Sequence, residues 1–386
     1  MDELQVPNIE KLSAVQALCD RELPYANFEG RDELFIEGMK QSLQWHRDQN
    51  PFYEKFLTSQ NYNPEQIKEL SDLEKFPYLL ANFFKKYEVP TACEEDVVLH
   101  LTSSGTSGQK SQMFFDEWSI KSAQRMVDWI FNHYQWITPE QPVNYLLYTY
   151  EPELDSKLGT AYTDNFLCGY APVNKVVYAL KNSGSGHKFD AFGVIKALQE
   201  FAEEGLPVRI FGFPSFFYFT LEQMQKLKLE PLKLNPESLT FFGGGWKGQQ
   251  DKAILKEDLY QLAEEMLGIP NERLRDGFGS VEHCIPYVEC QNHNFHIPQY
   301  SEVIIRDVKT LKALPFGEVG YLNFISPYIT SVPANNVLMG DLASLHTSEE
   351  CNCGNPSKFF KIIGRAGLTK NKSCAISAAE LLKEFQ

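Results

Sequence analysis

Apolar residues near the start of the chain recur at the spacing of an α-helix. Phe35, Met39 and Leu43 fall on one helical face, because positions three to four residues apart project from the same side. The pattern is interrupted at Pro51, since proline disrupts the interior of a helix. We therefore predict that residues 1–90 form a mainly helical region.

Further along, short apolar runs typical of strands alternate with longer runs of helical periodicity. The predicted strands cover residues 97–101, 144–148, 208–213 and 239–242, and the predicted helices cover residues 116–134 and 191–204. In the second of these helices, Phe192, Ile195, Leu198 and Phe201 mark the expected apolar face. This alternation predicts an α/β fold with a mostly parallel sheet, in which ligands bind beyond the carboxyl ends of the strands.

The composition and the net charge indicate which partners and which cellular compartment to expect. Of 386 residues, 43% are hydrophobic, which is enough for a sizeable core, and the formal net charge is −15. An acidic surface repels nucleic acids and anionic membranes, so we expect neither as a partner. The polar N-terminus has no signal-peptide pattern, and no apolar run is long enough to span a bilayer. We expect a cytoplasmic protein whose eight cysteines are reduced, metal-bound or catalytic.

A hydroxyl- and glycine-rich stretch follows the apolar segment 97–101. Its candidate binding residues are Ser103, Ser104, Gly105, Thr106, Ser107, Gly108 and Lys110. Glycines allow backbone angles at which amide N–H groups converge on an anion, while hydroxyls and lysine add donors and positive charge. The spacing differs from the Walker pattern. We predict a phosphate-binding loop, and the alternative is a flexible surface loop.

This stretch resembles the nucleotide loop of the adenylate-forming enzymes, Ser-Ser-Gly-Thr-Thr-Gly-x-Pro-Lys. It lacks the proline and has Lys110 followed by Ser111, which is more similar to the acyl-protein synthetases of the bacterial bioluminescence fatty-acid reductase complex. Phenylacetate–CoA ligases are wider relatives. The resemblance implies an α/β fold like the large N-terminal domain of an adenylate-forming enzyme, with mostly parallel sheets packed with helices and the lid domain reduced to a short tail. We expect a helical region 1–90, a core 91–363 and a tail 364–386.

Two later motifs strengthen the resemblance. The first is a glycine cluster that leaves room for a flat ring against the backbone: Gly243, Gly244, Gly245 and Trp246. In the adenylate-forming enzymes this region borders the adenine. The second motif, aromatic-Gly-x-Thr-Glu, is represented by residues 278–282. The resemblance implies that Phe278 stacks on adenine and that Glu282 binds Mg²⁺. Val281 replaces the threonine and removes one phosphate hydrogen bond.

The motifs near the end of the chain concern the ribose and the lid. Asp341, in Met-Gly-Asp, resembles the aspartate that binds the ribose hydroxyls, and Arg365 resembles an arginine that also reaches the ribose. Only residues 366–386 follow, too few for the usual lid domain and its catalytic lysine.

Cys374 is the candidate acceptor of an acyl group. Lys370 and Lys372 precede it and favour the thiolate, which is the reactive form. The bioluminescence synthetases have a similar basic stretch that ends in Gly-Cys-Ala-Leu-Ser, and their cysteine takes the acyl group. The alternative is an inert buried cysteine before a terminal helix at residues 378–385.

Four other residues predict a structural zinc site. Cys290 and His296 lie close together in the sequence, and Cys351 and Cys353 form Cys-x-Cys-Gly. Three thiolates and one imidazole make a tetrahedral site for Zn²⁺, and some phenylacetate–CoA ligases have similar residues. The competing ligands are His283, Cys284 and His293. The alternative is a set of scattered reduced cysteines.

The resemblance implies a two-step reaction with Lys110, Glu282 and Cys374 as catalytic residues. A fatty or aryl carboxylic acid reacts with ATP and Mg²⁺ to give acyl-AMP, and a thiol then takes the acyl group. The candidate acid-binding aromatics are Phe213, Phe216, Phe217 and Tyr218. An acyl reductase or another acyl-acceptor protein is the expected partner. The alternatives are an acyl–CoA ligase and a nucleotide- or carboxylate-binding protein without turnover.

Overall fold

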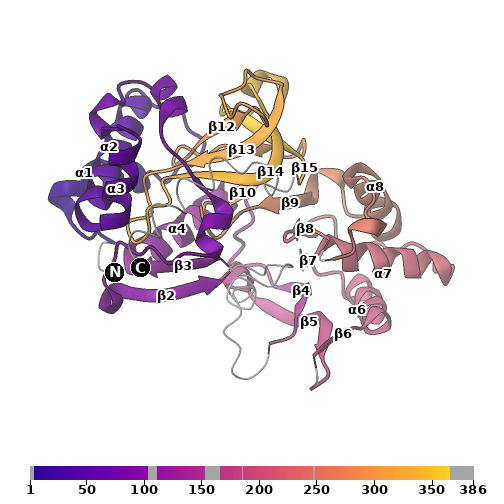
Figure 1. Cartoon of the computed structure of the whole chain (residues 1–386). Coiled ribbons are helices and arrows are strands. Elements are labelled where there is room, and N and C mark those ends of the chain that lie inside the picture. The colour runs from indigo at the N-terminus through magenta and orange to yellow at the C-terminus, as the bar shows by residue number, and fades with distance from the viewer. Residues whose placement is uncertain (1–3, 103–110, 153–165, 185, 247, 366–386) are drawn as a thin grey trace. The chain divides into compact units, whose positions relative to one another are not determined.

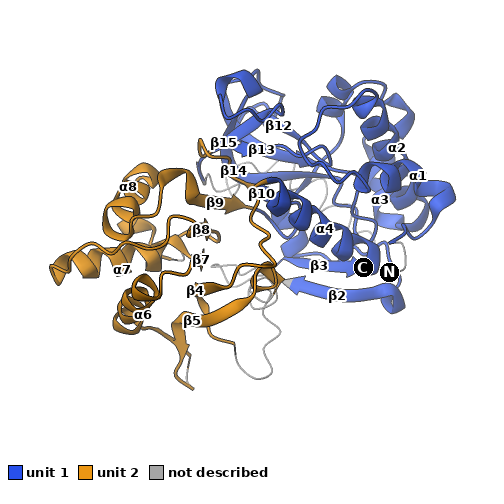
Figure 2. Ribbon diagram, turned by 180° about the vertical axis from the view of Figure 1, so that it is seen from behind, with its two compact units in different colours: residues 1–133, 279–287, 294–386 blue, residues 134–278, 288–293 orange. Residues whose placement is uncertain are grey.

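The computed structural model describes residues 4–102, 111–152, 166–184, 186–246 and 248–365. The chain divides into two compact units, which Figure 2 shows in different colours. The first unit comprises residues 1–133, 279–287 and 294–386, and the second comprises residues 134–278 and 288–293. Within the described ranges, no helix combines the length and the apolar character needed to cross a membrane.

The first unit opens with three helices, α1 (Ile9–Cys19), α2 (Arg31–Gln49) and α3 (Pro51–Ser59) (Figure 1). Phe35, Met39 and Leu43 are fully buried, which confirms the predicted apolar face. Asn50 ends α2 and caps α3, because its side-chain oxygen accepts a hydrogen bond from the backbone of Tyr53 at 3.0 Å. The predicted break at this position is confirmed. Short 3₁₀ turns follow at Pro64–Gln66, Leu70–Lys75, Ala81–Lys85 and Glu94–Asp96.

An antiparallel hairpin and a long helix come next in the first unit. Its elements are β2 (Val97–Thr102), β3 (Gln112–Asp116) and α4 (Glu117–His133). Asp116 caps α4, because its Oδ1 accepts the backbone N–H of Ser119 at 2.8 Å. Its Oδ2 accepts the hydroxyl of Thr330 at 2.6 Å. The predicted strand before the phosphate loop is thus confirmed, whereas the loop itself, residues 103–110, lies outside the described residues.

A mixed sheet completes the first unit. Its antiparallel strands run in the order β11 (Phe295–His296), β15 (Phe359–Arg365), β14 (Asn336–His346), β13 (Val319–Ile325) and β12 (Glu302–Arg306). The short strand β1 (Leu79–Leu80) pairs with β14 in parallel, and a 3₁₀ turn occupies Ser348–Glu350. Strand β14 therefore pairs with β1 from the N-terminal part of the chain and with β13 and β15 from the C-terminal part.

The second unit is built on a seven-stranded sheet. Its order is β10 (Tyr287–Val288), β9 (Leu274–Phe278), β8 (Leu239–Phe242), β7 (Val208–Gly212), β4 (Val143–Tyr150), β5 (Val173–Asn182) and β6 (His187–Phe189). Strands β5, β4, β7, β8 and β9 are parallel, and β6 is antiparallel to β5. The predicted mostly parallel sheet is confirmed.

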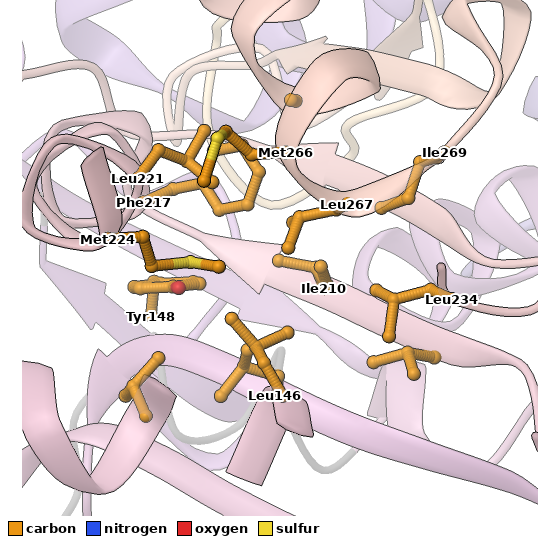
Figure 3. Close-up of a cluster of buried hydrophobic side chains, with 14 of the residues drawn as sticks. Leu146, Tyr148, Ile210, Phe217, Leu221, Met224, Leu234, Met266, Leu267 and Ile269 are labelled. Atoms are coloured by element: carbon orange, nitrogen blue, oxygen red, sulfur yellow. The ribbon is translucent and has the colours of Figure 1, made fainter. Parts of the chain in front are cut away.

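Three helices pack on this sheet and form its hydrophobic core. They are α6 (Ala191–Glu204), α7 (Pro214–Lys226) and α8 (Lys256–Leu267), with 3₁₀ turns at Gln250–Lys252 and Asn271–Arg273. Figure 3 shows Phe217 and Met224 of α7 beside Ile210 of β7, and Met266 of α8 belongs to the same cluster. Burial of these apolar side chains is the main force that holds helices on a sheet.

The prediction was wrong for one residue of the apolar face of α6. Ile195, Leu198 and Phe201 are buried as expected, but Phe192 is 67% exposed. At 3.6 residues per turn, Phe192 lies about 160° around the helix from buried Val194, which is the opposite side. Each three-residue step from 192 to 201 drifts by about 60° around the helix, so Phe192 lies on the side opposite to buried Phe201.

Candidate active site

A buried carboxylate and a buried hydroxyl meet in the first unit. Glu282 is only 5% exposed, and Ser111 is fully buried. The Oγ of Ser111 donates a hydrogen bond to Oε1 of Glu282. Ser111 directly follows the predicted phosphate loop, and Glu282 is the predicted magnesium ligand. The structure therefore brings the residue that ends the loop against this carboxylate, although Ser111 was not among the predicted site residues.

A tight turn holds Glu282 in place. The backbone N–H groups of His283 and Cys284 donate to the carbonyl of Ser280, at 3.2 and 2.7 Å. The Ser280 hydroxyl contacts the sulfur of Met339 in β14 at 3.9 Å. Cys284 adopts a φ of 57°, in the left-handed region that side chains rarely occupy. The turn and the strand that carries Asp341 are therefore packed together.

His283 belongs to the interior of the first unit. Its Nε2 lies 2.8 Å from the hydroxyl of Tyr287 and 3.2 Å from that of Ser301. Its ring stacks on Phe324 with centroids 4.5 Å apart. Burial lowers the pKa of His283 to about 3, so the imidazole is neutral at pH 7. These contacts occupy one ring nitrogen with hydroxyl groups and give His283 a packing role.

The two predicted ribose-binding residues come from neighbouring strands. Asp341 in β14 is 7% exposed, and it is the register partner of Arg365 at the end of β15. Partners across an antiparallel ladder lie about 5 Å apart at their Cα atoms. The structure therefore brings the backbones of these two predicted ribose-binding residues together.

The predicted glycine cluster forms a turn after β8 in the second unit. The N–H of Gly243 donates to the carbonyl of Gly212 at 3.0 Å, which joins the ends of β8 and β7. Gly244 and Gly245 have φ angles of 76° and 63°, a region in which glycine is favoured. Trp246 lies in ring contact with Tyr218, with centroids 5.7 Å apart. The indole ring of Trp246 therefore directly follows three glycines, which have no side chains.

Phe278 ends the neighbouring strand β9 (Leu274–Phe278), which was not among the predicted strands. The preceding Gly277 has no room for a side chain, since a Cβ there would lie 2.5 Å from the ring of Phe241. The close contact between Gly277 and the Phe241 ring therefore restricts the position of the backbone just before Phe278.

Aromatic side chains gather at the carboxyl ends of β4 and β7. Tyr150 lies 5.0 Å from the His187 ring and 5.5 Å from the Phe213 ring, and Phe213 lies 6.4 Å from Phe216. Phe217, by contrast, is fully buried against Phe242 in the hydrophobic core, so it packs the helix on the sheet and does not line an acid pocket. Tyr150 and His187 were not among the predicted acid-binding aromatic residues. Tyr150 could have been found by the rule for strand ends that identified Phe213.

The four predicted zinc ligands come together. The Nε2 of His296 lies 3.3 Å from the sulfur of Cys351 and 3.2 Å from that of Cys353. With Cys290, the four candidate ligand atoms all lie within 4.8 Å of one another. The competing His293 instead places its Nε2 2.7 Å from Oδ1 of Asn271. In a tetrahedral zinc site, neighbouring nitrogen and sulfur ligands lie roughly 3.6 Å apart, so separations in this range suit such a centre.

The surroundings of the cluster match the needs of a thiolate–zinc centre. The Nδ1–H of His296 donates to the carbonyl of Ser357 at 2.7 Å, which turns the other nitrogen toward the thiols. Burial lowers the pKa of His296 to about 4, so the imidazole is neutral. Each sulfur also accepts an N–H: from Asn292 to Cys290, from Asn294 to Cys351 and from Asn355 to Cys353. Donors of this kind stabilise thiolates.

A sequence model of the family described as acyl-protein synthetase, LuxE, matches residues 8–383 of the chain. The chain belongs to this acyl-protein synthetase family. Two curated relatives of this synthetase are long-chain-fatty-acid–luciferin-component ligases. The Aliivibrio fischeri protein is 23% identical over 361 residues, which cover 93% of this chain and 91% of the relative. The Vibrio harveyi protein is 24% identical over 345 residues, which cover 89% and 86%.

Solved structures similar to this synthetase are adenylate-forming ligases. A 2-hydroxyisobutyryl-CoA ligase in the postadenylation state aligns with a TM-score of 0.66 at 16% identity, over 99% of this chain and 78% of that one. The open form of the same ligase, in complex with 2-HIB-AMP and CoA, gives a TM-score of 0.63. At this identity the likeness concerns the fold alone, and it confirms the predicted fold class.

Several predicted residues of this synthetase lie outside the described ranges. They include the loop residues 103–108, Lys110 and Cys374, whose roles stay predictions. The side chain of Arg365 is likewise not described. Cys284, the competing thiol beside Glu282, is placed. Burial and the nearby Glu282 carboxylate raise the pKa of its thiol to about 11, so it carries little thiolate at pH 7.

Proposed function

We propose that this synthetase activates a long-chain fatty acid with ATP and transfers the acyl group to one of its own cysteines. The observation that carries the proposal is the hydrogen bond between Ser111 and Glu282. It links the end of the phosphate loop to a buried carboxylate inside the first unit. The relatives from Aliivibrio fischeri and Vibrio harveyi, both named as long-chain-fatty-acid ligases, support this class of acid.

In the first step, a carboxylate oxygen of the fatty acid attacks the α-phosphorus of ATP, and pyrophosphate leaves. We assign Lys110 and the loop 103–108 to the phosphates. Glu282 offers the hard oxygen ligand that Mg²⁺ prefers, and its buried place beside Ser111 fits that ion. When bound, Mg²⁺ neutralises charge on the phosphates. The remaining nucleotide contacts are assigned to Gly243, Gly244, Gly245, Trp246 and Phe278 for adenine, and to Asp341 and Arg365 for ribose.

In the second step, the thiolate of Cys374 attacks the carbonyl carbon of the acyl-adenylate, and AMP leaves with the electrons of the broken bond. The product is a thioester on the enzyme. A thioester is a suitable substrate for a reductase, so an acyl reductase or another acyl-acceptor protein is the proposed partner. Holding the thiol on the same chain makes this step intramolecular, which can accelerate it by many orders of magnitude.

The test is ATP–pyrophosphate exchange with a panel of fatty and aryl acids. We expect exchange with long-chain fatty acids, and formation of a protein-bound acyl label that hydroxylamine releases. Release of acyl–CoA, without labelled protein, would favour a CoA ligase. Nucleotide binding without exchange for any acid would favour a binding protein and contradict the proposal.

We also propose one structural Zn²⁺ held by Cys290, His296, Cys351 and Cys353. The support is their mutual approach within 4.8 Å and the N–H donors directed at the sulfurs. Four protein ligands leave no open position for substrate, which is typical of a structural site. Metal analysis of protein purified without chelator should give one zinc per chain, and its absence would contradict the assignment.

A further inference from the structure

A fully buried carboxylate lies beside the last residues of β9 in the second unit. The Glu289 side chain has no exposed area. Its backbone N–H donates to the carbonyl of Asp276 at 3.1 Å, and its Oε2 accepts the backbone N–H of Asp276 at 2.8 Å. The guanidinium of Arg275 donates to the carbonyl of Glu289 at 2.7 Å. Glu289 therefore forms hydrogen bonds with both the backbone N–H and the backbone carbonyl of Asp276.

Helix α8 neutralises and orients this carboxylate. The ammonium of Lys256 pairs with Oε1 of Glu289, and the hydroxyl of Tyr260 donates to Oε2 at 3.0 Å. Lys256 and Tyr260 are four residues apart and so share one face of the helix. A buried carboxylate is costly unless it is paired and hydrogen-bonded. These three side chains form one connected unit, and its contacts are directed at the end of β9.

In the sheet, β9 lies between β8 and β10, and Glu289 directly follows β10. The register between β8 and β9 runs only as far as Asp276, which is opposite Phe242. The N–H of Gly277 then donates to Oδ1 of Asp276 at 2.9 Å, so the orientation of Asp276 sets the course of the residues after it. Phe278 follows directly. Any rotation at Asp276 is therefore transmitted to the aromatic ring.

We propose that Glu289 is a positioning residue for nucleotide binding. It fixes Asp276 from both backbone groups and thereby presents Phe278 to the adenine in one orientation. An aromatic ring that is held in its binding orientation before the ligand arrives loses less entropy on binding. The inference rests on the proposed function, which assigns Phe278 to adenine.

A matched control separates this role from a contribution to folding alone. Glu302 is also a buried glutamate, with 7% of its side chain exposed, and it pairs with Arg31 and Lys358 in the first unit. Both Glu289→Gln and Glu302→Gln remove a buried charge from an ion pair at nearly constant volume. Only the first contacts the strand that ends in Phe278.

The experiment measures ATP affinity by titration calorimetry, and separately the KM for the fatty acid in the exchange reaction. We expect Glu289→Gln to weaken ATP binding by about tenfold or more, as for loss of a charge-assisted hydrogen bond, and to leave the KM for the acid unchanged. Glu302→Gln should leave both quantities unchanged. Tyr260→Phe, which removes one hydroxyl only, serves if Glu289→Gln fails to fold, and it should weaken ATP binding by a few-fold.

Unchanged ATP affinity in folded Glu289→Gln, or equal losses for the nucleotide and the acid, would overturn the inference. If Glu289→Gln does not fold, unchanged affinity in Tyr260→Phe would do the same. Wild-type protein that binds ATP without exchange would refute the proposed function, yet the calorimetric comparison would still test Glu289. Failure of the wild-type protein to bind ATP would overturn both.

Discussion

Glu282 and Glu302 are both buried glutamates of the first unit, but their partners differ. One oxygen of Glu302 pairs with the guanidinium of Arg31 and the other with the ammonium of Lys358. Glu282 receives the hydroxyl of Ser111 and, within the described part of the chain, forms no ion pair. A buried charge without a counter-ion is unfavourable, so a carboxylate left in this state is available for a cation from solution. The contrast supports a structural role for Glu302 and a ligand-binding role for Glu282.

The sharpest test of this contrast is Glu282→Gln. The change keeps the volume and an acceptor for Ser111 but removes the charge that would bind Mg²⁺. We expect ATP–pyrophosphate exchange to fall on the order of a hundredfold or more, because one electrostatic contact to the reacting phosphates is lost. The melting temperature should stay the same or rise, since the change removes a buried charge that has no ion-pair partner among the described residues. An exchange rate within a few-fold of the wild-type rate would contradict the ligand-binding role of Glu282.

The four proposed zinc ligands extend the comparison to a second proposed metal-binding site. Cys351→Ser should reduce zinc content well below one per chain and lower the melting temperature by several degrees, because a structural site contributes to folding. Cys93→Ser is the control, since Cys93 is an exposed thiol outside the cluster. Unchanged zinc content and melting temperature in Cys351→Ser would refute the proposed ligand set.

Glu302→Gln should show the opposite behaviour to Glu282→Gln. We expect a loss of about 1–3 kcal/mol in the free energy of unfolding, because Arg31 and Lys358 lose a charged partner. Exchange should remain within twofold of wild type. A variant that lost exchange while keeping its stability would reverse the assigned roles of the two glutamates.

The pH dependence of stability provides a second measurement on Glu302. Burial raises the pKa of Glu302, but Arg31 and Lys358 outweigh it and hold the pKa below the usual 4.5. The ionised pair therefore adds stability above pH 4.5, and this stability is lost as the pH falls through the lower pKa of the folded state. The melting temperature of the wild type should fall more steeply below this pH than that of Glu302→Gln. Parallel curves would contradict the assigned ion pair.

Ser111→Ala should lower exchange much less than Glu282→Gln. It removes a single hydrogen bond to Glu282 and leaves the carboxylate in place. A hydrogen bond to a charged group contributes about 1.5–3 kcal/mol at most, and water or a metal ion can replace part of it, so we expect exchange to fall by roughly tenfold or less. A loss as large as that of Glu282→Gln would assign Ser111 a direct contact with ATP or its metal ion.

The sequence predicted much of this fold because its signals were local. The helical face around Phe35, the break at Asn50 and the parallel strand that ends at Gly212 follow from periodicity and strand-end rules. The strand that ends at Phe278 was not predicted. The error at Phe192 arose because a three-residue spacing alone does not define which side of a helix is buried. The division into 1–90, 91–363 and 364–386 stays a prediction, as does the cytoplasmic location.

The candidate sites were only partly predictable. The four candidate zinc ligands could be predicted to lie together because thiols and imidazoles are few and their spacing is distinctive. Ser111, Tyr150 and Glu289 were missed, since a serine, a tyrosine or a glutamate has no special meaning in a sequence until its partners are known. Two of the partners of Glu289, for example, are the ammonium of Lys256, 33 residues earlier in the chain, and the backbone of Asp276.

The most direct test of the two-step account is acyl labelling of Cys374→Ala with radioactive long-chain fatty acid and ATP. Wild-type protein should accumulate about one hydroxylamine-sensitive acyl group per chain, since one thiol takes the acyl group from the adenylate. Cys374→Ala should lose this label and keep ATP–pyrophosphate exchange, because adenylation needs no acceptor thiol. Persistence of the label in Cys374→Ala, or release of acyl–CoA by a wild-type protein that never becomes labelled, would contradict the account.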